Sequence, residues 1–264
     1  MRTIRNCGEV ARTVAINGAM KPATSNPEPT SWPPPPPHSA IAVLISGGLD
    51  SAVLLGESLQ WFEAVFPVYI STGSYWESVE RLYLDRFLNA VAQPKLRPLK
   101  VLRVPTDDLY DDHWSMTGVG SPHFDAPDEA VYLPGRNVIL LSKAMIWCHL
   151  QGIPFLATAP LDANPFPDAT PDFVTRYQSV VNQAIDGSVQ IIRPYIQMNK
   201  VSVIRRGKHL PLQHTFSCVH PIHDQHCGAC NKCAERQFAF RDAAVADPTH
   251  YARPRSEKDS LCSV

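Results

Sequence analysis

The chain has 264 residues, of which 44% are hydrophobic and 19% charged, and its formal net charge is −1. This length allows one domain with a buried core and a small appendage. A near-neutral chain lacks the basic footprint that dominates nucleic-acid affinity, so we expect no large polynucleotide partner. No apolar run reaches the ~20 residues of a membrane helix, and no signal-peptide core follows the basic start, so we expect a cytoplasmic protein.

Residues 21–40 contain eight of the chain's 25 prolines, five of them in succession from Pro33 to Pro37. Such a run favours extended polyproline conformation and excludes a helix or a central strand. The segment therefore predicts a stiff spacer within an N-terminal arm at 1–40. The alternative is a ligand for a partner protein that reads proline-rich sequences.

From residue 41 onward, strand patterns alternate with helical patterns. Strands are predicted at 41–45, 64–70, 99–104 and 154–159, with a last one beginning at 191. Helices are predicted at 51–61, 75–91, 137–150 and 171–186, whereas 106–133 reads as irregular. The alternation predicts an α/β fold, a doubly wound parallel sheet with helices on both faces. Such sheets bind ligands beyond the carboxyl ends of their strands, which points to 46–51, 71–76 and 160–170.

The segment Ser46-Gly47-Gly48-Leu49-Asp50-Ser51 follows the first predicted strand and opens the first helix. Its glycines let the backbone approach a ligand closely, and N–H groups at a helix N-terminus bind anions. Ser46 and Ser51 add hydroxyl donors, while Asp50 could cap the helix or help to hold magnesium. The alternative is a glycine-rich turn with an Asp or Ser cap.

The lysine of a Walker loop is absent from this segment. The pattern resembles instead the pyrophosphate loop (S-G-G-x-D-S) of the ATP-pyrophosphatase superfamily. Members of that superfamily cleave ATP between its α- and β-phosphates and transfer AMP to an oxygen of the substrate. The resemblance implies that residues 46–51 bind ATP.

Four of the seven cysteines, Cys218, Cys227, Cys230 and Cys233, lie within 16 positions. An odd count with one tight cluster favours a metal site in a reducing compartment over disulfide bonds. Four thiolates at this spacing suit a closed, structural zinc site, with an iron–sulfur cluster as the alternative. Three histidines in the same loop, His220, His223 and His226, are interpreted as exposed loop residues rather than ligands.

These two motifs in this order make the chain similar to the 7-cyano-7-deazaguanine synthase family, which carries a pyrophosphate loop near its start and a Cys-x8-Cys-x2-Cys-x2-Cys zinc site near its end. Leu133-Pro134-Gly135-Arg136-Asn137 resembles the family's P-G-R-N segment. Residues 162–173 resemble its acidic loop, and Arg193-Pro194-Tyr195 with Lys200 resembles the stretch that follows. The resemblance runs from about residue 41 to 243.

The resemblance implies an ATP-dependent, AMP-forming carbon–nitrogen ligase of queuosine biosynthesis. Its substrates would be 7-carboxy-7-deazaguanine and ammonia, and its products 7-cyano-7-deazaguanine, AMP and pyrophosphate. Mg²⁺ would accompany ATP at the loop, and Zn²⁺ would bind the four cysteines. No segment resembles a glutaminase domain, so free ammonia is the implied nitrogen donor.

Four further residues receive roles on this interpretation. The forked guanidinium of Arg136 suits a phosphate or a carboxylate, and Lys200 could neutralise the departing pyrophosphate. Asp162 and Asp168 could hold the exocyclic amine and ring N–H of a purine-like base. The alternatives are a surface arginine, a helix-starting lysine and an acidic loop that caps the helix near 171.

One segment departs from the family pattern. After the second strand the family carries Y-G-Q-R-H, whereas residues 71–77 read Ser-Thr-Gly-Ser-Tyr-Trp-Glu. The exchange removes positive charge and adds flat apolar surface, so Trp76 is predicted to stack on a purine-like ring. The alternative is that Tyr75 and Trp76 start a helix and pack inward.

Two rival functions remain beside the nitrile-forming ligase. A divergent paralogue would adenylate a related acid and form an amide or a conjugate with another amine. A non-catalytic zinc-binding interaction protein would use the proline-rich arm, although the intact pyrophosphate loop argues against it. We expect an ATP-binding domain at 41–210, a zinc-binding region at 211–245 and a tail at 246–264, and we leave a homodimer open.

Overall fold

The structure is a computed structural model that describes residues 39–162 and 164–253. The proline-rich segment and the arm expected at 1–40 lie outside the described residues, apart from the last two positions. Of the tail expected at 246–264, the described part ends at residue 253. No helix within the described ranges is long and apolar enough to cross a membrane.

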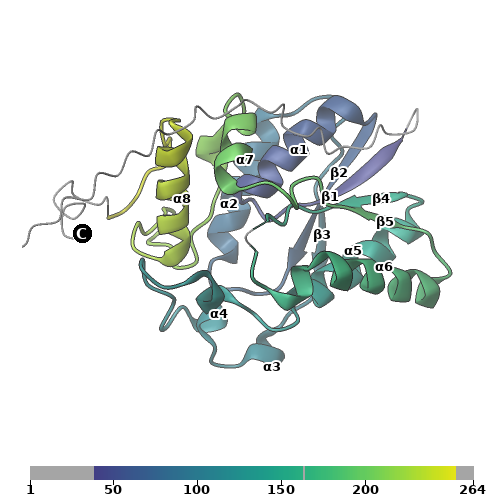
Figure 1. The fold of residues 1–264 in the computed structure, drawn as a ribbon, viewed down its shortest axis with the longest axis horizontal. Coiled ribbons are helices and arrows are strands. Elements are labelled where there is room, and N and C mark those ends of the chain that lie inside the picture. Colours follow the sequence, from purple (N-terminus) through teal and green to yellow (C-terminus); the bar gives the residue numbers. More distant parts are fainter. Residues whose placement is uncertain (1–38, 163, 254–264) are drawn as a thin grey trace, which may run out of the picture. The chain divides into compact units, whose positions relative to one another are not determined.

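A parallel sheet forms the centre of the fold. Its strands are β1 (Ala40–Leu44), β2 (Ala64–Ser71), β3 (Lys100–Arg103), β4 (Phe155–Ala157) and β5 (Gln190–Ile192). They lie in the order β3-β2-β1-β4-β5, and each pairs in parallel with its neighbours (Figure 1). The chain thus adds β2 and β3 on one side of β1 and then β4 and β5 on the other side. This reversal produces a crevice at the carboxyl end of β1, the place where such sheets bind ligands.

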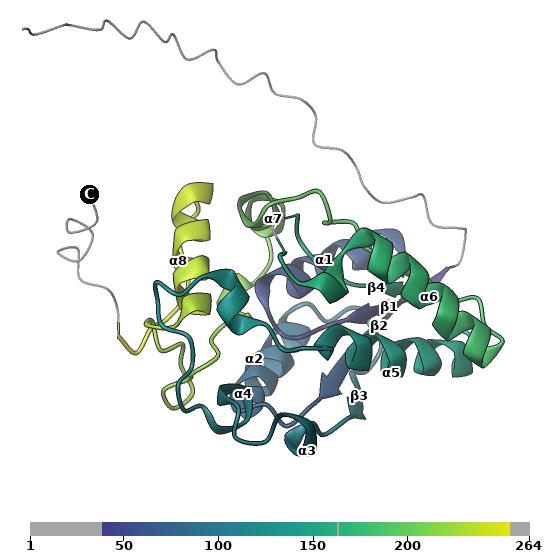
Figure 2. The same cartoon turned by 60° about the horizontal axis from the view of Figure 1, so that its bottom comes forward.

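Helices cover both faces of the sheet (Figures 1 and 2). One face carries α1 (Leu49–Trp61), α2 (Glu77–Ala90), α7 (Lys200–Gly207) and α8 (Asn231–Ala243). The other carries α5 (Arg136–Leu150) and α6 (Pro171–Ile185). Successive residues of β1 point to opposite faces of the sheet. Ile41 belongs to the apolar core under the first group of helices, and Ala42 belongs to the core under α5 and α6. The predicted doubly wound α/β fold is therefore confirmed.

The segment 106–133, expected to be irregular, contains short helices. They are α3 (Asp107–Tyr110), α4 (Trp114–Thr117) and the 3₁₀ turn η1 (Asp128–Val131). Four residues make little more than one turn, so their sequence shows no helical period. Two further 3₁₀ turns, η2 (Pro167–Ala169) and η3 (Leu212–His214), also went unpredicted.

Helix α7 was not among the predicted helices, although a helix start was the alternative considered for Lys200, its first residue. Asn199 caps it by accepting the backbone N–H of Ser202 at 2.9 Å. The last residue of α7 is Gly207, where an added β-carbon would lie 2.2 Å from Cγ2 of Val53. The missing side chain lets α7 pack directly on α1, which brings Lys200 beside the segment 46–51.

Candidate active site and metal centre

The segment 46–51 forms the turn between β1 and α1. Gly47 has φ of 79°, and a β-carbon there would lie 3.2 Å from the carbonyl oxygen of Glu80. Glycine is therefore needed at this position for both its dihedral and its close approach to α2. The carbonyl of Gly47 accepts the N–H of Phe216 at 2.8 Å, which ties the turn to the segment before the cysteine cluster.

No described side chain caps the start of α1. Gly48 is the N-cap residue, and the hydroxyl of Ser51 donates to its carbonyl at 3.1 Å. Asp50 lies in the first turn but does not cap it, so the alternative of an Asp- or Ser-capped turn is wrong. The first N–H groups of α1 consequently remain available to an anion at the positive end of the helix dipole.

Asp50 instead belongs to a charged network with α7 and α8. Nζ of Lys200 lies 2.5 Å from Oδ2 of Asp50 and 2.9 Å from Oε1 of Glu235. Although burial opposes the charged forms, the two carboxylates raise the pKa of Lys200, and Lys200 with Lys232 lowers the pKa of Glu235 to about 2. Oδ1 of Asp50 is buried with no partner among the described residues. A carboxylate oxygen left open beside an anion site fits a magnesium ligand.

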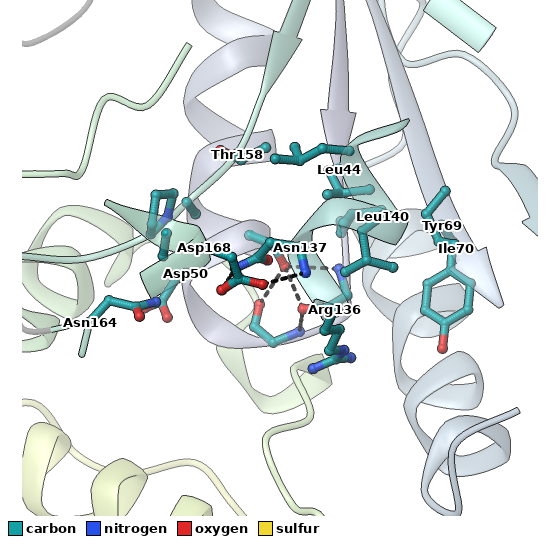
Figure 3. A pocket seen from close by; sticks show the side chains of 18 of the residues that line it. Leu44, Asp50, Tyr69, Ile70, Arg136, Asn137, Leu140, Thr158, Asn164 and Asp168 are labelled. Atoms are coloured by element: carbon teal, nitrogen blue, oxygen red, sulfur yellow. Dashed lines mark hydrogen bonds between the residues drawn. The ribbon is translucent and has the colours of Figure 1, made fainter. Parts of the chain in front are cut away.

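Two adjoining cavities, of about 260 and 540 Å³, lie beside this loop. Both are lined by Ser46, Gly48, Asp50, Glu80, Arg136, Asn137, Asn164 and Asp168. The smaller cavity (Figure 3) has an apolar portion that includes Leu44, Ile70, Leu140 and Val174. The larger has aromatic walls that include Trp76, Trp114, Tyr132, Phe166 and Phe216. Any ligands in the two spaces would meet at the loop.

Arg136 is the first residue of α5 and lines both cavities. Its guanidinium lies 5.9 Å from the centroid of the Trp76 ring and forms no hydrogen bond or ion pair with other described residues. Asp168 accepts two hydrogen bonds of 3.0 Å from Asn137, one from the backbone and one from the side chain (Figure 3). Asp168 therefore orders the start of α5, which positions Arg136. The helix near 171 is capped by Thr170 and not by these acids.

The remaining predicted substrate residues are placed differently. Asp162 is exposed and lines neither cavity. Trp76 is only 4% exposed, stacks on Trp114 with centroids 5.7 Å apart, and borders the larger cavity. It therefore packs inward and offers part of its surface to the cavity. Tyr75 lies outside both spaces and stacks on His220.

The four cysteines converge on one buried point. Their sulfur atoms all lie within 4.8 Å of one another, with Cys230–Cys218 at 3.8 Å and Cys227–Cys233 at 3.9 Å. A tetrahedral zinc with bonds of ~2.3 Å places its sulfurs about 3.8 Å apart. The backbone N–H groups of His220 and Cys227 each donate to Sγ of Cys218 at 3.3 Å, which favours a thiolate. The cluster fits a metal ion held by these four sulfurs.

The loop around the cluster is shaped by two other residues. Gly228 has φ of 80°, and a β-carbon on it would lie 2.2 Å from the carbonyl oxygen of Arg253. His226, interpreted as exposed, is completely buried, and its Nε2 accepts the N–H of Ser217 at 3.1 Å. That interpretation is wrong because the loop folds under the aromatic rings of Tyr83, Phe216 and Tyr251. Burial lowers the pKa of His226 below its usual range.

Sequence reasoning missed several residues that line the cavities, among them Glu80, Trp114, Lys232 and Glu235. Glu80 is 8% exposed and accepts a 2.5 Å hydrogen bond from the hydroxyl of Tyr69. Burial raises its pKa to about 7. A glutamate within a helix usually faces solvent, so only a partner on a neighbouring strand reveals its position.

Comparison with known proteins gives one family. The family described as Queuosine biosynthesis protein QueC matches residues 40–244. The 7-cyano-7-deazaguanine synthase of Syntrophobacter fumaroxidans is 30% identical over 235 residues, which cover 80% of this chain and 95% of that protein. The synthase of Stutzerimonas stutzeri is 28% identical over 222 residues (79% and 96%), and that of Xanthomonas oryzae pv. oryzae 30% over 229 (80% and 96%).

Proposed function

Because the chain belongs to the Queuosine biosynthesis protein QueC family, we propose that it acts as a 7-cyano-7-deazaguanine synthase. In this function it is an ATP-dependent, AMP-forming ligase that converts 7-carboxy-7-deazaguanine and ammonia to the nitrile. The observation that carries the proposal is the pair of cavities that share the loop 46–51 as a common wall. Two reactants that must exchange an adenylyl group require such a meeting point.

The smaller cavity suits ATP. Its apolar portion would hold the adenine, and the open N–H groups of α1 would bind the phosphates. Oδ1 of Asp50 would contact the magnesium that accompanies them. Lys200, held beside Asp50, would neutralise the pyrophosphate as it leaves. Magnesium supplies charge neutralisation on the phosphates, and the chain supplies their position.

The larger cavity suits the deazapurine acid. Its aromatic walls, with Trp76 among them, offer flat surface to a heterocycle. Arg136 is the guanidinium at the common wall without a carboxylate partner, so it would orient the substrate carboxylate or the α-phosphate. A role for Asp162 and Asp168 in holding the base remains a prediction. Asp168 would contact the base while it keeps its two hydrogen bonds to Asn137.

The reaction proceeds in two activations. A carboxylate oxygen attacks the α-phosphorus of ATP, and the bond to pyrophosphate breaks. Ammonia then attacks the acyl carbon, and AMP departs to leave an amide. A second ATP adenylates the amide oxygen, and loss of AMP and a proton leaves the nitrile. The four-cysteine metal would stabilise the fold of the C-terminal region rather than enter the chemistry.

The test is incubation of the purified protein with ATP, magnesium, ammonium and 7-carboxy-7-deazaguanine, followed by chromatography and mass spectrometry. We expect AMP, pyrophosphate and the nitrile. ADP and phosphate would contradict the AMP-forming assignment. An amide as the final product, or turnover of a related acid alone, would support the divergent paralogue, for which the altered 71–77 segment is the specific observation.

A further inference from the structure

Glu80 lies where the two cavities meet. It is in the first turn of α2, lines both spaces and is 8% exposed. The hydroxyl of Tyr69 donates to its Oε2 at 2.5 Å. A β-carbon on Gly47 would lie 3.3 Å from Cγ of Glu80, so the side chain rests against the loop 46–51. The carboxyl group is thus fixed beside the place where the adenylated acid would form.

Glu80 also differs from the other carboxylates that line these cavities within the described residues. Asp50, Asp128 and Glu235 are each paired with a lysine. Asp168 is occupied by Asn137. Glu80 has a neutral phenol as its partner and no lysine or arginine within ion-pair distance. It is therefore the cavity carboxylate that can receive a new cation without losing an existing one.

We propose that Glu80 binds the ammonium ion and accepts the proton that ammonium loses before its nitrogen attacks the adenylated acid. This inference rests on the proposed function and names a proton acceptor for it. At neutral pH ammonia is present almost entirely as ammonium, which has no lone pair with which to attack. A small cation also needs an acceptor of its own, and Glu80 is the cavity carboxylate among the described residues that neither a lysine nor Asn137 already occupies.

The step balances as follows. Ammonium transfers one proton to the Glu80 carboxylate, and the resulting ammonia forms a bond to the acyl carbon. The carbon–oxygen bond to the phosphate breaks, and AMP leaves with the electron pair. The nitrogen then loses a second proton to water to give the neutral amide. The protonated Glu80 returns its proton to solvent through the open cavity before the next turnover.

The groups around Glu80 suit this proton transfer. Burial raises its pKa to about 7, while Tyr69 of β2, Arg136 of α5 and Trp76 at the start of α2 act in the opposite direction. Glu77 on the same helix acts with burial to raise the pKa of Glu80. A carboxyl group that titrates near neutral pH can both take and release a proton during turnover. The geometry and the titration therefore favour the same role.

Glu80→Gln tests the proposal through three measurements on the full chain. Pyrophosphate exchange into ATP, dependent on the acid, reports adenylation, and it should stay within about threefold of the wild type. Product formation with ammonium should fall at least about 100-fold, within the range expected for lost general-base catalysis. Hydroxamate formation from hydroxylamine, which is neutral at the assay pH, should be retained. Glu129→Gln, at an exposed position outside both cavities, is the matched control.

A second variant gives an independent test should Glu80→Gln fold poorly. Tyr69→Phe removes a hydrogen bond that favours the carboxylate, so the pKa of Glu80 should rise. The ammonium-dependent kcat/KM should then reach its midpoint at a higher pH, while the hydroxylamine reaction keeps its profile. Equal losses with both nucleophiles, or loss of exchange in a folded Glu80→Gln protein, would overturn the proposal. Absence of acid-dependent exchange in the wild type would contradict the proposed function instead.

Discussion

The ammonium group of Lys200 lies 2.5 Å from Oδ2 of Asp50, so the first residue of α7 is joined to the first turn of α1. Lys200 also contacts Glu235 of α8, the helix that begins directly after Cys230 and contains Cys233. The loop 46–51 and the cysteine cluster are therefore connected through one lysine and two carboxylates.

Asp50→Ala should abolish AMP release, because it removes both the carboxylate oxygen that is proposed to bind magnesium and the partner of Lys200. The measurement is chromatography of nucleotides after incubation with ATP and the acid. Metal content and far-ultraviolet circular dichroism should remain unchanged. Asp172→Ala, an exposed acid in the first turn of α6, is the control and should keep full activity. If AMP release persists in Asp50→Ala, Asp50 is not required for the reaction and the prediction is wrong.

Glu235→Gln should alter how stability depends on pH. The pKa of Glu235 is lowered from 4.5 to about 2, so its contribution is fully present above pH 4.5 and is lost as the pH falls toward 2. The variant should be less stable than the wild type by about 1–3 kcal/mol at pH 7. That difference should shrink progressively between pH 4.5 and 3. Urea unfolding at several pH values measures it, and a constant difference would show that the ion pairs contribute nothing.

The purified protein should contain about one zinc per chain, as the four converging sulfurs predict. Cys230→Ser should lose the metal and unfold at lower temperature, because a closed site contributes folding free energy. Cys148→Ser is the control, because it alters a buried cysteine that is far from the cluster in sequence. It measures the stability lost by replacing a buried cysteine with serine when no metal is lost. Elemental analysis identifies the bound metal, and a brown protein rich in iron would contradict the zinc assignment.

Gly228→Ala should destabilise the cysteine loop. The left-handed dihedral costs about 1–2 kcal/mol, and the new methyl would collide with the carbonyl of Arg253. Gly152→Ala has a similar positive φ but open space around it, so it isolates the dihedral cost. We expect the first variant to lose at least about 2 kcal/mol more than the second. Equal losses in denaturant titrations would show that the contact with Arg253 is easily relieved.

Trp76→Leu should weaken binding of the deazapurine acid while ATP binding stays intact. The substitution keeps an apolar side chain in the wall but removes the flat surface that a heterocycle would contact, worth roughly 1–3 kcal/mol. The apparent KM for the acid should therefore rise about tenfold or more. Trp61→Leu changes an exposed tryptophan and serves as the control. An unchanged KM would show that Trp76 packs in the wall but does not contact the acid.

Much of the fold could be read from local patterns. The strands at 41–45 and 64–70 are continuous apolar runs, and the helices at 137–150 and 171–186 carry clear start signals, so each was found within a few residues. The short helices of 106–133 could not be found, because tertiary packing rather than local periodicity holds them. The cysteine spacing likewise predicted that four sulfurs would converge.

The sequence by itself located the two candidate sites, because a glycine-rich turn and a cysteine cluster carry their chemistry within a short stretch of residues. Only the tertiary structure decided which distant side chains complete those sites. Lys200 reaches Asp50 across 150 positions because Gly207 lets α7 pack on α1. Glu80 belongs to the cavity wall because Tyr69 of the neighbouring strand holds it there. Burial and pairing of charges depend on elements remote in the chain, so no local pattern specifies them.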